Sequence, residues 1–236
     1  MSFEAETADP SRVVVLISGS GSNLQALLDA QEHDELGGNI IAVISNKADA
    51  YGLERAREAG VIAEVVDPAR FRHFHDERDR DLYDAELIRI IDHHQPDLVV
   101  LAGFMRILSK AFVLRYHGRL LNIHPSLLPE YRGLHTHRRA LEEGATLHGA
   151  SVHFVTEELD GGPIVVQAAV PVEADDDEST LAERVLTREH LIYPMTVRWF
   201  LDGRLQLADK GPTLDGHPLP ASGLRLAPED VSDEDL

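Results

Sequence analysis

Residues 12–28, which read RVVVLISGSGSNLQALL, decide the fold of this chain. The first six residues form a nearly continuous apolar run, which is typical of a strand buried on both faces in a parallel sheet. A loop of Gly and Ser follows, and Leu24, Leu27 and Leu28 then recur at helical spacing. A buried strand that passes through a glycine loop into a helix indicates an α/β fold.

The alternation of strand and helix continues along the chain. Further strands are expected at 40–44, 61–66, 98–102, 119–123, 150–155 and 163–172, and helices at 51–59, 79–94 and 179–190, with no clear crossover helix between the strands after residue 118. This order predicts an α/β protein with a Rossmann-like, mostly parallel twisted sheet and helices on both faces. We expect an N-terminal extension (1–11), one domain (12–210) and a C-terminal segment with an acidic tail (211–236).

The glycine loop after the first strand is a candidate phosphate site. Gly21 would let the backbone approach a ligand closely, and the free N–H groups of the following helix would attract an anion. Ser22 and Gln25 have the spacing of a capping box, so we expect the helix to begin at Ser22. The loop lacks the third glycine of the dinucleotide fingerprint and the lysine of a P-loop. A monophosphate site and a ligand-free tight turn both remain open.

Asn122 and His124 are candidate catalytic residues. Two residues apart near the end of an expected strand, they share one face, where an amide and a protonated imidazole could stabilise a developing oxyanion. Asp160, which precedes Gly-Gly-Pro in an expected turn, could lie near His124 and favour its imidazolium form. The alternatives are a polar pair that satisfies loop backbone and an aspartate that caps a turn.

Composition limits the partners of the protein. The 236 residues include 41 Asp and Glu against 22 Lys and Arg, a formal net charge of −19. Such a field repels nucleic acid and anionic lipid, so neither is expected as a partner. The acids are spread along the chain, which favours a halophilic type of composition suited to a salt-rich cytoplasm over an acidic binding surface. The chain has no cysteine, which excludes thiolate chemistry.

Five stretches closely resemble the glycinamide ribonucleotide formyltransferases. They are LISGSGSNLQALLDA (16–30), SNKADAYGLERAREAG (45–60), VVLAGFMRILS (99–109), LLNIHPSLLPEYRGLHTHRRALEEG (120–144) and HGASVHFVTEELDGGPIV (148–165). The likeness runs from about residue 12 to about residue 219. The segment that begins at Asn122 marks the wider folate-dependent formyltransferase superfamily, whereas the glycine loop and the Ser-Asn-Lys-Ala-Asp-Ala stretch are specific to the ribonucleotide enzymes.

The resemblance implies the formyltransferase fold, a reaction and a site. Formyl transfer from 10-formyltetrahydrofolate, the co-substrate, to the amine of glycinamide ribonucleotide would serve purine synthesis, without a metal. Its implied roles are catalytic for Asn122, His124 and Asp160, substrate binding for Gly21, Ser22, Asn23 and Glu189, and folate binding for Arg80, Met105, Arg106, Ile107, Leu108 and Asn122.

Other interpretations of the sequence are kept beside this one. A formyltetrahydrofolate deformylase would use water as the acceptor, but that family carries an N-terminal regulatory domain, and here the first strand begins near residue 12. A methionyl-tRNA formyltransferase normally has a basic C-terminal domain, whereas this C-terminus is short and acidic. A non-catalytic nucleotide-binding module is the third alternative. We expect a cytoplasmic monomer or homodimer that acts on small molecules.

Overall fold

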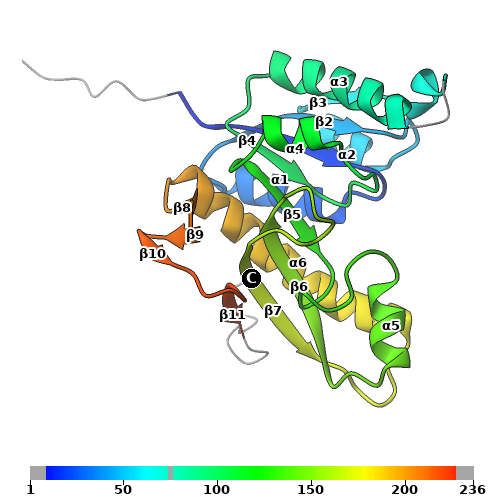
Figure 1. The fold of residues 1–236 in the computed structure, drawn as a ribbon, viewed down its shortest axis with the longest axis vertical. Coiled ribbons are helices and arrows are strands. Elements are labelled where there is room, and N and C mark those ends of the chain that lie inside the picture. Colours follow the sequence, from blue (N-terminus) through cyan, green and yellow to red (C-terminus); the bar gives the residue numbers. More distant parts are fainter. Residues whose placement is uncertain (1–8, 74–76, 227–236) are drawn as a thin grey trace, which may run out of the picture.

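The computed structural model describes residues 9–73 and 77–226 (Figure 1). Its main sheet has eight strands in the order β11-β7-β6-β5-β4-β1-β2-β3. The strands are β1 (Arg12–Ile17), β2 (Asn39–Ser45), β3 (Ile62–Val65), β4 (Leu98–Leu101), β5 (Leu120–His124), β6 (Leu147–Phe154), β7 (Ile164–Pro171) and β11 (Leu224–Leu226). A small antiparallel sheet contains β8 (Leu205–Ala208), β9 (Gly211–Leu214) and β10 (His217–Pro218).

Helices connect and cover these strands. They are α1 (Ser22–Glu32), α2 (Gly52–Glu58), the 3-10 helix η1 (Pro68–Phe71), α3 (Glu77–His93), α4 (Lys110–Arg115), α5 (Thr136–Glu142) and α6 (Glu178–Leu201). Every pairing in the main sheet is parallel except the two that β6 makes with β5 and β7. The predicted α/β fold with a mostly parallel sheet is therefore confirmed.

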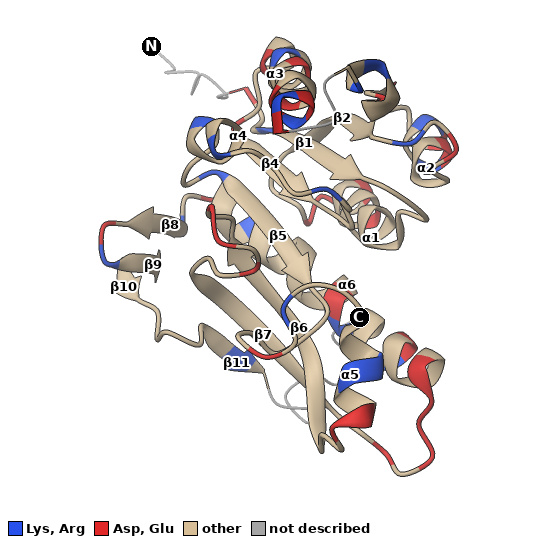
Figure 2. Ribbon diagram, turned by 45° about the vertical axis from the view of Figure 1, so that its right-hand side comes forward, with Lys and Arg blue, Asp and Glu red and all other residues tan. Residues whose placement is uncertain are grey.

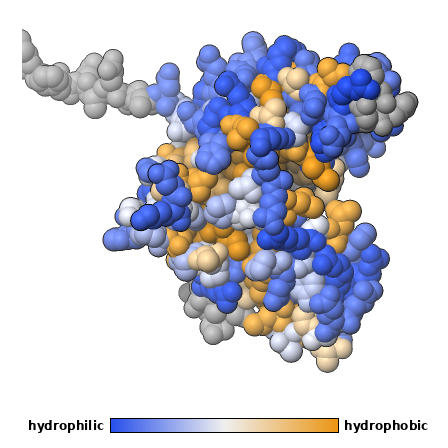
Figure 3. All heavy atoms as spheres, in the orientation of Figure 1, coloured by the Kyte–Doolittle hydropathy of each residue, from blue (hydrophilic) through white to orange (hydrophobic). Residues whose placement is uncertain are grey.

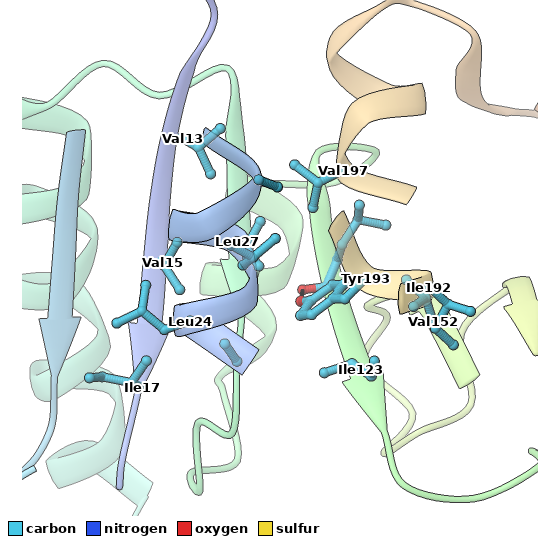
Figure 4. Close-up of a cluster of buried hydrophobic side chains, with 14 of the residues drawn as sticks. Val13, Val15, Ile17, Leu24, Leu27, Ile123, Val152, Ile192, Tyr193 and Val197 are labelled. Atoms are coloured by element: carbon cyan, nitrogen blue, oxygen red, sulfur yellow. Dashed lines mark hydrogen bonds between the residues drawn. The ribbon is translucent and has the colours of Figure 1, made fainter. Parts of the chain in front are cut away.

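Strand β1 is buried on both faces because helices cover both sides of the sheet. Val13, Val15 and Ile17 belong to one hydrophobic core with α1, α2 and α6 (Figure 4). The residues between them, Val14 and Leu16, belong to a second core with α3 and α4. The two cores follow from the alternation of side chains along a strand, applied to a run with no polar residue.

Helix α6 is longer than the sequence pattern predicted. A capping box at Asp177 and Thr180 starts it, and the helix continues through Pro194 to Leu201 instead of ending near residue 190. Tyr193 and Val197 lie beyond that expected end and are buried, so tertiary packing outweighs the backbone hydrogen bond lost at Pro194. The hydroxyl of Tyr193 donates to the carbonyls of Leu101 and Leu121, which ties α6 to β4 and β5.

Two other local expectations were wrong. Helix α1 begins at Ser22 as expected, but its N-cap is Gly21 in the left-handed conformation, without a side-chain cap, so Ser22 and Gln25 form no capping box. Helix α5, which lies between β5 and β6, was not expected. The predicted C-terminal segment begins in β9, and its strand β11 pairs with β7. The acidic tail beyond residue 226 and most of the N-terminal extension lie outside the described residues.

Charged residues lie mainly on the helices and loops, while the strands of the sheet are largely free of them (Figure 2). The face seen in Figure 3 is mostly hydrophilic, with hydrophobic patches between the hydrophilic residues. Within the described part of the chain, no helix has the length and apolar character needed to cross a membrane.

Candidate active site

The site lies at one edge of the main sheet. Strands β2, β1, β4 and β5 are parallel neighbours, so their carboxyl ends meet at this edge, and the order of the strands reverses between β1 and β4. Ligands bind at such reversal points in α/β sheets. The side chain of Ser18 joins the loops there: its hydroxyl donates to Oδ1 of Asn46 (2.6 Å) and accepts from the backbone N–H of Met105 (2.8 Å).

The glycine loop takes its shape from close backbone packing. Gly21 has a φ of 72°, and a Cβ at this position would lie 2.7 Å from Cα of Gly52. The N–H of Gly52 donates to the carbonyl of Gly19 (3.1 Å). No other residue fits at Gly21 without moving α2 away. The loop therefore places Ser22 and Asn23 in the first turn of α1, where backbone N–H groups lack partners within the helix.

Asn23 joins this loop to a buried acid on α6. Its Nδ2 donates to Oε2 of Glu189 at 2.6 Å. Glu189 is 7% exposed, and burial raises the pKa of its carboxyl group to about 7, although the hydrogen bond from Asn23 opposes the rise. The carboxyl group of Glu189 can therefore accept a hydrogen bond or a proton from an amine at neutral pH.

Asn122 and His124 lie on β5 opposite residues of β6. Asn122 pairs with His153 in the strand register, and its Nδ2 lies 3.1 Å from Nε2 of His153. The other nitrogen of His153, Nδ1, must donate to the carbonyl of Phe154 at 2.9 Å, because a carbonyl only accepts. Burial lowers the pKa of His153, which favours the neutral ring. Nε2 then accepts from Asn122 and fixes its amide.

Sequence reasoning did not select His153 as a site residue. Its segment was quoted for the resemblance, but no spacing rule connected it with Asn122. The usable signal was the antiparallel register of β5 and β6, which follows from tertiary structure. With one amide N–H held by His153, the second N–H of Asn122 remains for a ligand.

Both ring nitrogens of His124 face acceptors. Nε2 lies 3.0 Å from the carbonyl oxygen of Tyr131, and Nδ1 lies 3.5 Å from Oδ2 of Asp160. The side chains of His124 and Asp160 are 8% and 10% exposed. The structure therefore brings His124 and Asp160 together and places an acceptor oxygen beside each ring nitrogen of His124.

The turn that follows β6 holds Asp160 in place. Asp160 has a left-handed φ of 48°, and its Oδ2 also accepts from the N–H of Gly133 (2.8 Å). Two residues later, a Cβ on Gly162 would lie 1.8 Å from the carbonyl oxygen of Phe154. The Asp160 carboxylate therefore contacts both the imidazole of His124 and the backbone of the segment after β5.

The segment between β4 and α4 contains most of the residues expected to bind folate. Met105 and Ile107 are 65% and 61% exposed, which is unusual for large apolar side chains, and Leu108 is half-buried. The guanidinium of Arg106 lies over the ring of Tyr83, 4.2 Å from its centroid. Arg80, on α3, lies 3.6 Å from Glu77 and acts electrostatically on Asp84, as Arg106 does. Apolar side chains beside two guanidinium groups suit a flat ligand with an anionic end.

In the described residues, no group of three or more His, Asp and Glu side chains has the geometry to hold a metal ion. The expectation that no metal takes part stays a prediction.

The sequence of residues 11–197 matches the family model of the formyl transferases. Over 211 residues the chain is 58% identical to the phosphoribosylglycinamide formyltransferase of Escherichia coli strain K12, which spans 89% of this chain and 97% of that protein. Over 210 residues it is 44% identical to the trifunctional purine biosynthetic protein adenosine-3 of Homo sapiens, spanning 89% of this chain and 20% of that protein.

The chain also resembles solved structures. The phosphoribosylglycinamide formyltransferase of Coxiella burnetii superposes with a TM-score of 0.86 at 48% identity, over 92% of this chain and 99% of that one. A formyltetrahydrofolate deformylase from Pseudomonas syringae superposes with a TM-score of 0.79 at 31% identity, over 88% of this chain and 66% of that one. The deformylase is the more distant of the two in sequence and in fold.

Proposed function

This chain belongs to the formyl transferase family, and on that premise we propose that it transfers the formyl group of 10-formyltetrahydrofolate to the amine of glycinamide ribonucleotide in purine synthesis. Glycinamide ribonucleotide is another name for phosphoribosylglycinamide, the compound in the names of the relatives. The observation that carries the chemistry is the placement of the His124 ring between the Asp160 carboxylate and the carbonyl of Tyr131, on the same strand as Asn122.

The reaction is a direct acyl transfer. The amine nitrogen bonds to the formyl carbon, and the carbonyl oxygen takes up negative charge. Asn122 donates its free amide N–H to that oxygen, and His124 donates Nε2–H after exchanging the Tyr131 carbonyl for the substrate. The bond from the formyl carbon to the folate nitrogen then breaks, and that nitrogen gains the proton that the amine loses. Asp160 keeps His124 charged and passes the proton, directly or through water.

The nucleotide occupies the side of the site formed by α1 and α6. Its phosphate accepts from the backbone N–H groups at Ser22 and Asn23, which the left-handed Gly21 leaves exposed to a ligand. Its amine lies near Glu189, whose carboxyl group is held by Asn23. A carboxyl with a pKa of about 7 accepts a hydrogen bond from the amine without forcing the amine into its unreactive ammonium form.

The folate occupies the side formed by α3 and the segment after β4. Its ring system contacts the exposed side chains of Met105 and Ile107, with Leu108 behind them, and its anionic part faces Arg106 and Arg80. Asn122 lies between the two ligands at the end of β5. The folate supplies the activated formyl group, and the protein supplies orientation and charge stabilisation.

Location, partners and composition remain proposals of the same kind. We propose that the protein works in the cytoplasm as a monomer or homodimer on small molecules, without a metal and without a nucleic-acid or membrane partner. The net charge of −19 supports the exclusion of polyanionic partners. The same charge supports a halophilic type of composition.

The test follows the absorbance change as 10-formyltetrahydrofolate loses its formyl group, with and without glycinamide ribonucleotide, at low and high salt. Folate turnover that requires the nucleotide is expected. His124→Ala should lower kcat by about 100-fold to 1,000-fold, because one oxyanion donor is lost. His217→Ala, on exposed β10, is the matched control and should keep full activity. Equal turnover without the nucleotide would instead identify a deformylase that uses water.

A further inference from the structure

Two backbone N–H groups of residues 102–109, the segment between β4 and α4, donate to side chains outside the segment. Near its start, the N–H of Met105 donates to the hydroxyl of Ser18. At its end, the N–H of Ser109 donates to Oδ2 of Asp84 at 2.5 Å. Ser109 also caps α4, since its hydroxyl accepts from the N–H of Phe112. The proposed folate residues thus lie on a loop whose two anchors are buried side chains outside the loop itself.

Asp84 is a buried acid that the proposed mechanism does not use. It lies on α3 and is 1% exposed. Burial raises the pKa of its carboxyl group, and the charges of Arg106 and Arg80 act in the opposite direction. A buried carboxylate costs stability unless it is paired, and the charges of Arg106 and Arg80 offset part of that cost for Asp84.

Tyr83, the residue before Asp84, packs its ring against the guanidinium of Arg106. Its side chain is fully buried, and the phenyl ring of Phe71 meets it edge-on at 5.8 Å. The guanidinium of Arg106 lies 4.2 Å from the ring centroid, within the range of a cation–π contact. The guanidinium of Arg106 therefore lies over a ring that packing holds in place.

The same cluster gathers buried polar atoms that have no hydrogen-bond partner. Nine such side-chain atoms occur among the described residues, and four of them belong to Tyr83, Asp84, Arg80 and Arg106. They are the Tyr83 hydroxyl, Oδ1 of Asp84 and the Nε atoms of both arginines. Concentrated unsatisfied groups are typical of sites that are completed by a ligand or ordered water. These four atoms therefore indicate that the cluster also takes part in binding.

We propose that Asp84 and Tyr83 are positioning residues of the folate site, which hold the 102–109 loop and orient the guanidinium of Arg106 toward the anionic part of the folate. Asp84 fixes the loop backbone at Ser109 and supplies negative charge between the two arginines. Tyr83 supplies the surface on which Arg106 lies. The inference rests on the proposed function, because it takes Arg106 to be a folate ligand.

The experiment measures KM for each substrate and kcat in Asp84→Asn. Asparagine keeps the size and the acceptor for Ser109 but loses the charge. We expect KM for 10-formyltetrahydrofolate to rise about tenfold, while kcat and KM for glycinamide ribonucleotide change less than about twofold. Asp92→Asn is the matched control on the same helix: Asp92 is half-buried, pairs with Arg115 and accepts from the hydroxyl of Tyr116, so its loss should leave both KM values unchanged.

A double-mutant cycle separates positioning from a structural role. In an Arg106→Gln background, Asp84→Asn should have almost no further effect on the folate KM, because the residue acts through Arg106. Tyr83→Leu should raise the folate KM more than Tyr83→Phe, which keeps the ring. This pair also tests the proposal if Asp84→Asn does not fold.

The outcomes distinguish this inference from the proposed function. A wild-type protein that transfers no formyl group to the nucleotide would overturn both. An active wild-type protein whose Asp84→Asn variant keeps its folate KM, or whose Asp84 and Arg106 effects simply add, would overturn the positioning role alone.

Discussion

Glu189 and Asn23 illustrate how a single pair can serve both binding and titration. An isolated carboxyl group in a nearly dry position prefers its neutral form, because burial penalises the charge. The amide of Asn23 satisfies one oxygen of Glu189 but brings no compensating positive charge. The result is an acid that changes protonation near neutral pH, beside the loop where the substrate phosphate is proposed to bind.

Glu189→Gln should change the pH dependence of stability. The pKa of Glu189 is about 7 in the folded protein and ordinarily 4.5, so between these values only the folded form holds the proton. Wild-type stability should therefore fall as pH rises through this window, by roughly 3 kcal/mol relative to the variant. Urea unfolding at fixed salt from pH 4.5 to pH 8 measures the difference.

Glu183→Gln, at an exposed position of the same helix, is the control and should follow the wild-type protein at each pH. A difference between Glu189→Gln and the wild-type protein that stays constant with pH would contradict the prediction. The nucleotide KM of Glu189→Gln should also rise at pH 8, where the lost charge matters most.

At the scale of elements, strand ends and one turn position the proposed catalytic groups. Strand β5 supplies Asn122 and His124, and β6 supplies His153 in register with Asn122. The turn after β6 returns to β7 through the Asp160-Gly161-Gly162 corner, where the N–H of Phe154 donates to the carbonyl of Pro163. The position of the Asp160 carboxylate therefore depends on a backbone path that only a residue without a side chain allows at Gly162.

Gly162→Ala should cost both stability and activity. The added Cβ would lie 1.8 Å from the Phe154 carbonyl oxygen, so the turn must move and carry Asp160 away from His124. We expect a loss of about 2–4 kcal/mol in unfolding free energy and at least about a tenfold fall in kcat. Chemical denaturation and steady-state kinetics measure the two effects.

Gly203→Ala is the matched control. Gly203 has a φ of 72°, and a Cβ at this position would meet no other atom within 4 Å. Only backbone strain of about 1 kcal/mol is therefore expected there, with kcat unchanged. If Gly162→Ala behaved like Gly203→Ala, the turn would not be the element that positions Asp160.

For the whole molecule, the excess of acids sets the response to salt. A net charge of −19 on a folded chain produces self-repulsion that unfolding relieves. Salt screens this repulsion over about 3 Å at molar concentration, compared with about 30 Å at 0.01 M. The buried site, with its short internal contacts, is screened much less than the surface.

The midpoint of thermal unfolding should therefore rise as KCl is increased from about 0.01 M to about 1 M. Sucrose at matched osmolality is the control, because it is excluded from the protein surface but does not screen charge. An equal rise in both solutes would assign the stabilisation to solute exclusion, and no rise in KCl would refute the interpretation of the composition.

The sequence by itself predicted seven of the eight strands of the main sheet, and the resemblance to a known family implied most of the residues proposed for the site. Apolar runs such as residues 12–17 are typical of strands buried on both faces, and helical spacing predicts what lies between them. Asn122 and His124 were placed on one face by the period of a strand. These inferences succeed because they depend on local periodicity, which the chain carries in its own order.

Only the tertiary structure decided which residues lie together across the chain. His153 reaches Asn122 through strand register, Asp84 reaches Ser109 through the packing of α3 on the loop after β4, and α6 continues past Pro194 because its far half is buried. The N-cap at Gly21 likewise depends on close packing against Gly52. Each of these contacts joins distant segments, and no pattern within one segment specifies the partner that the fold brings to it.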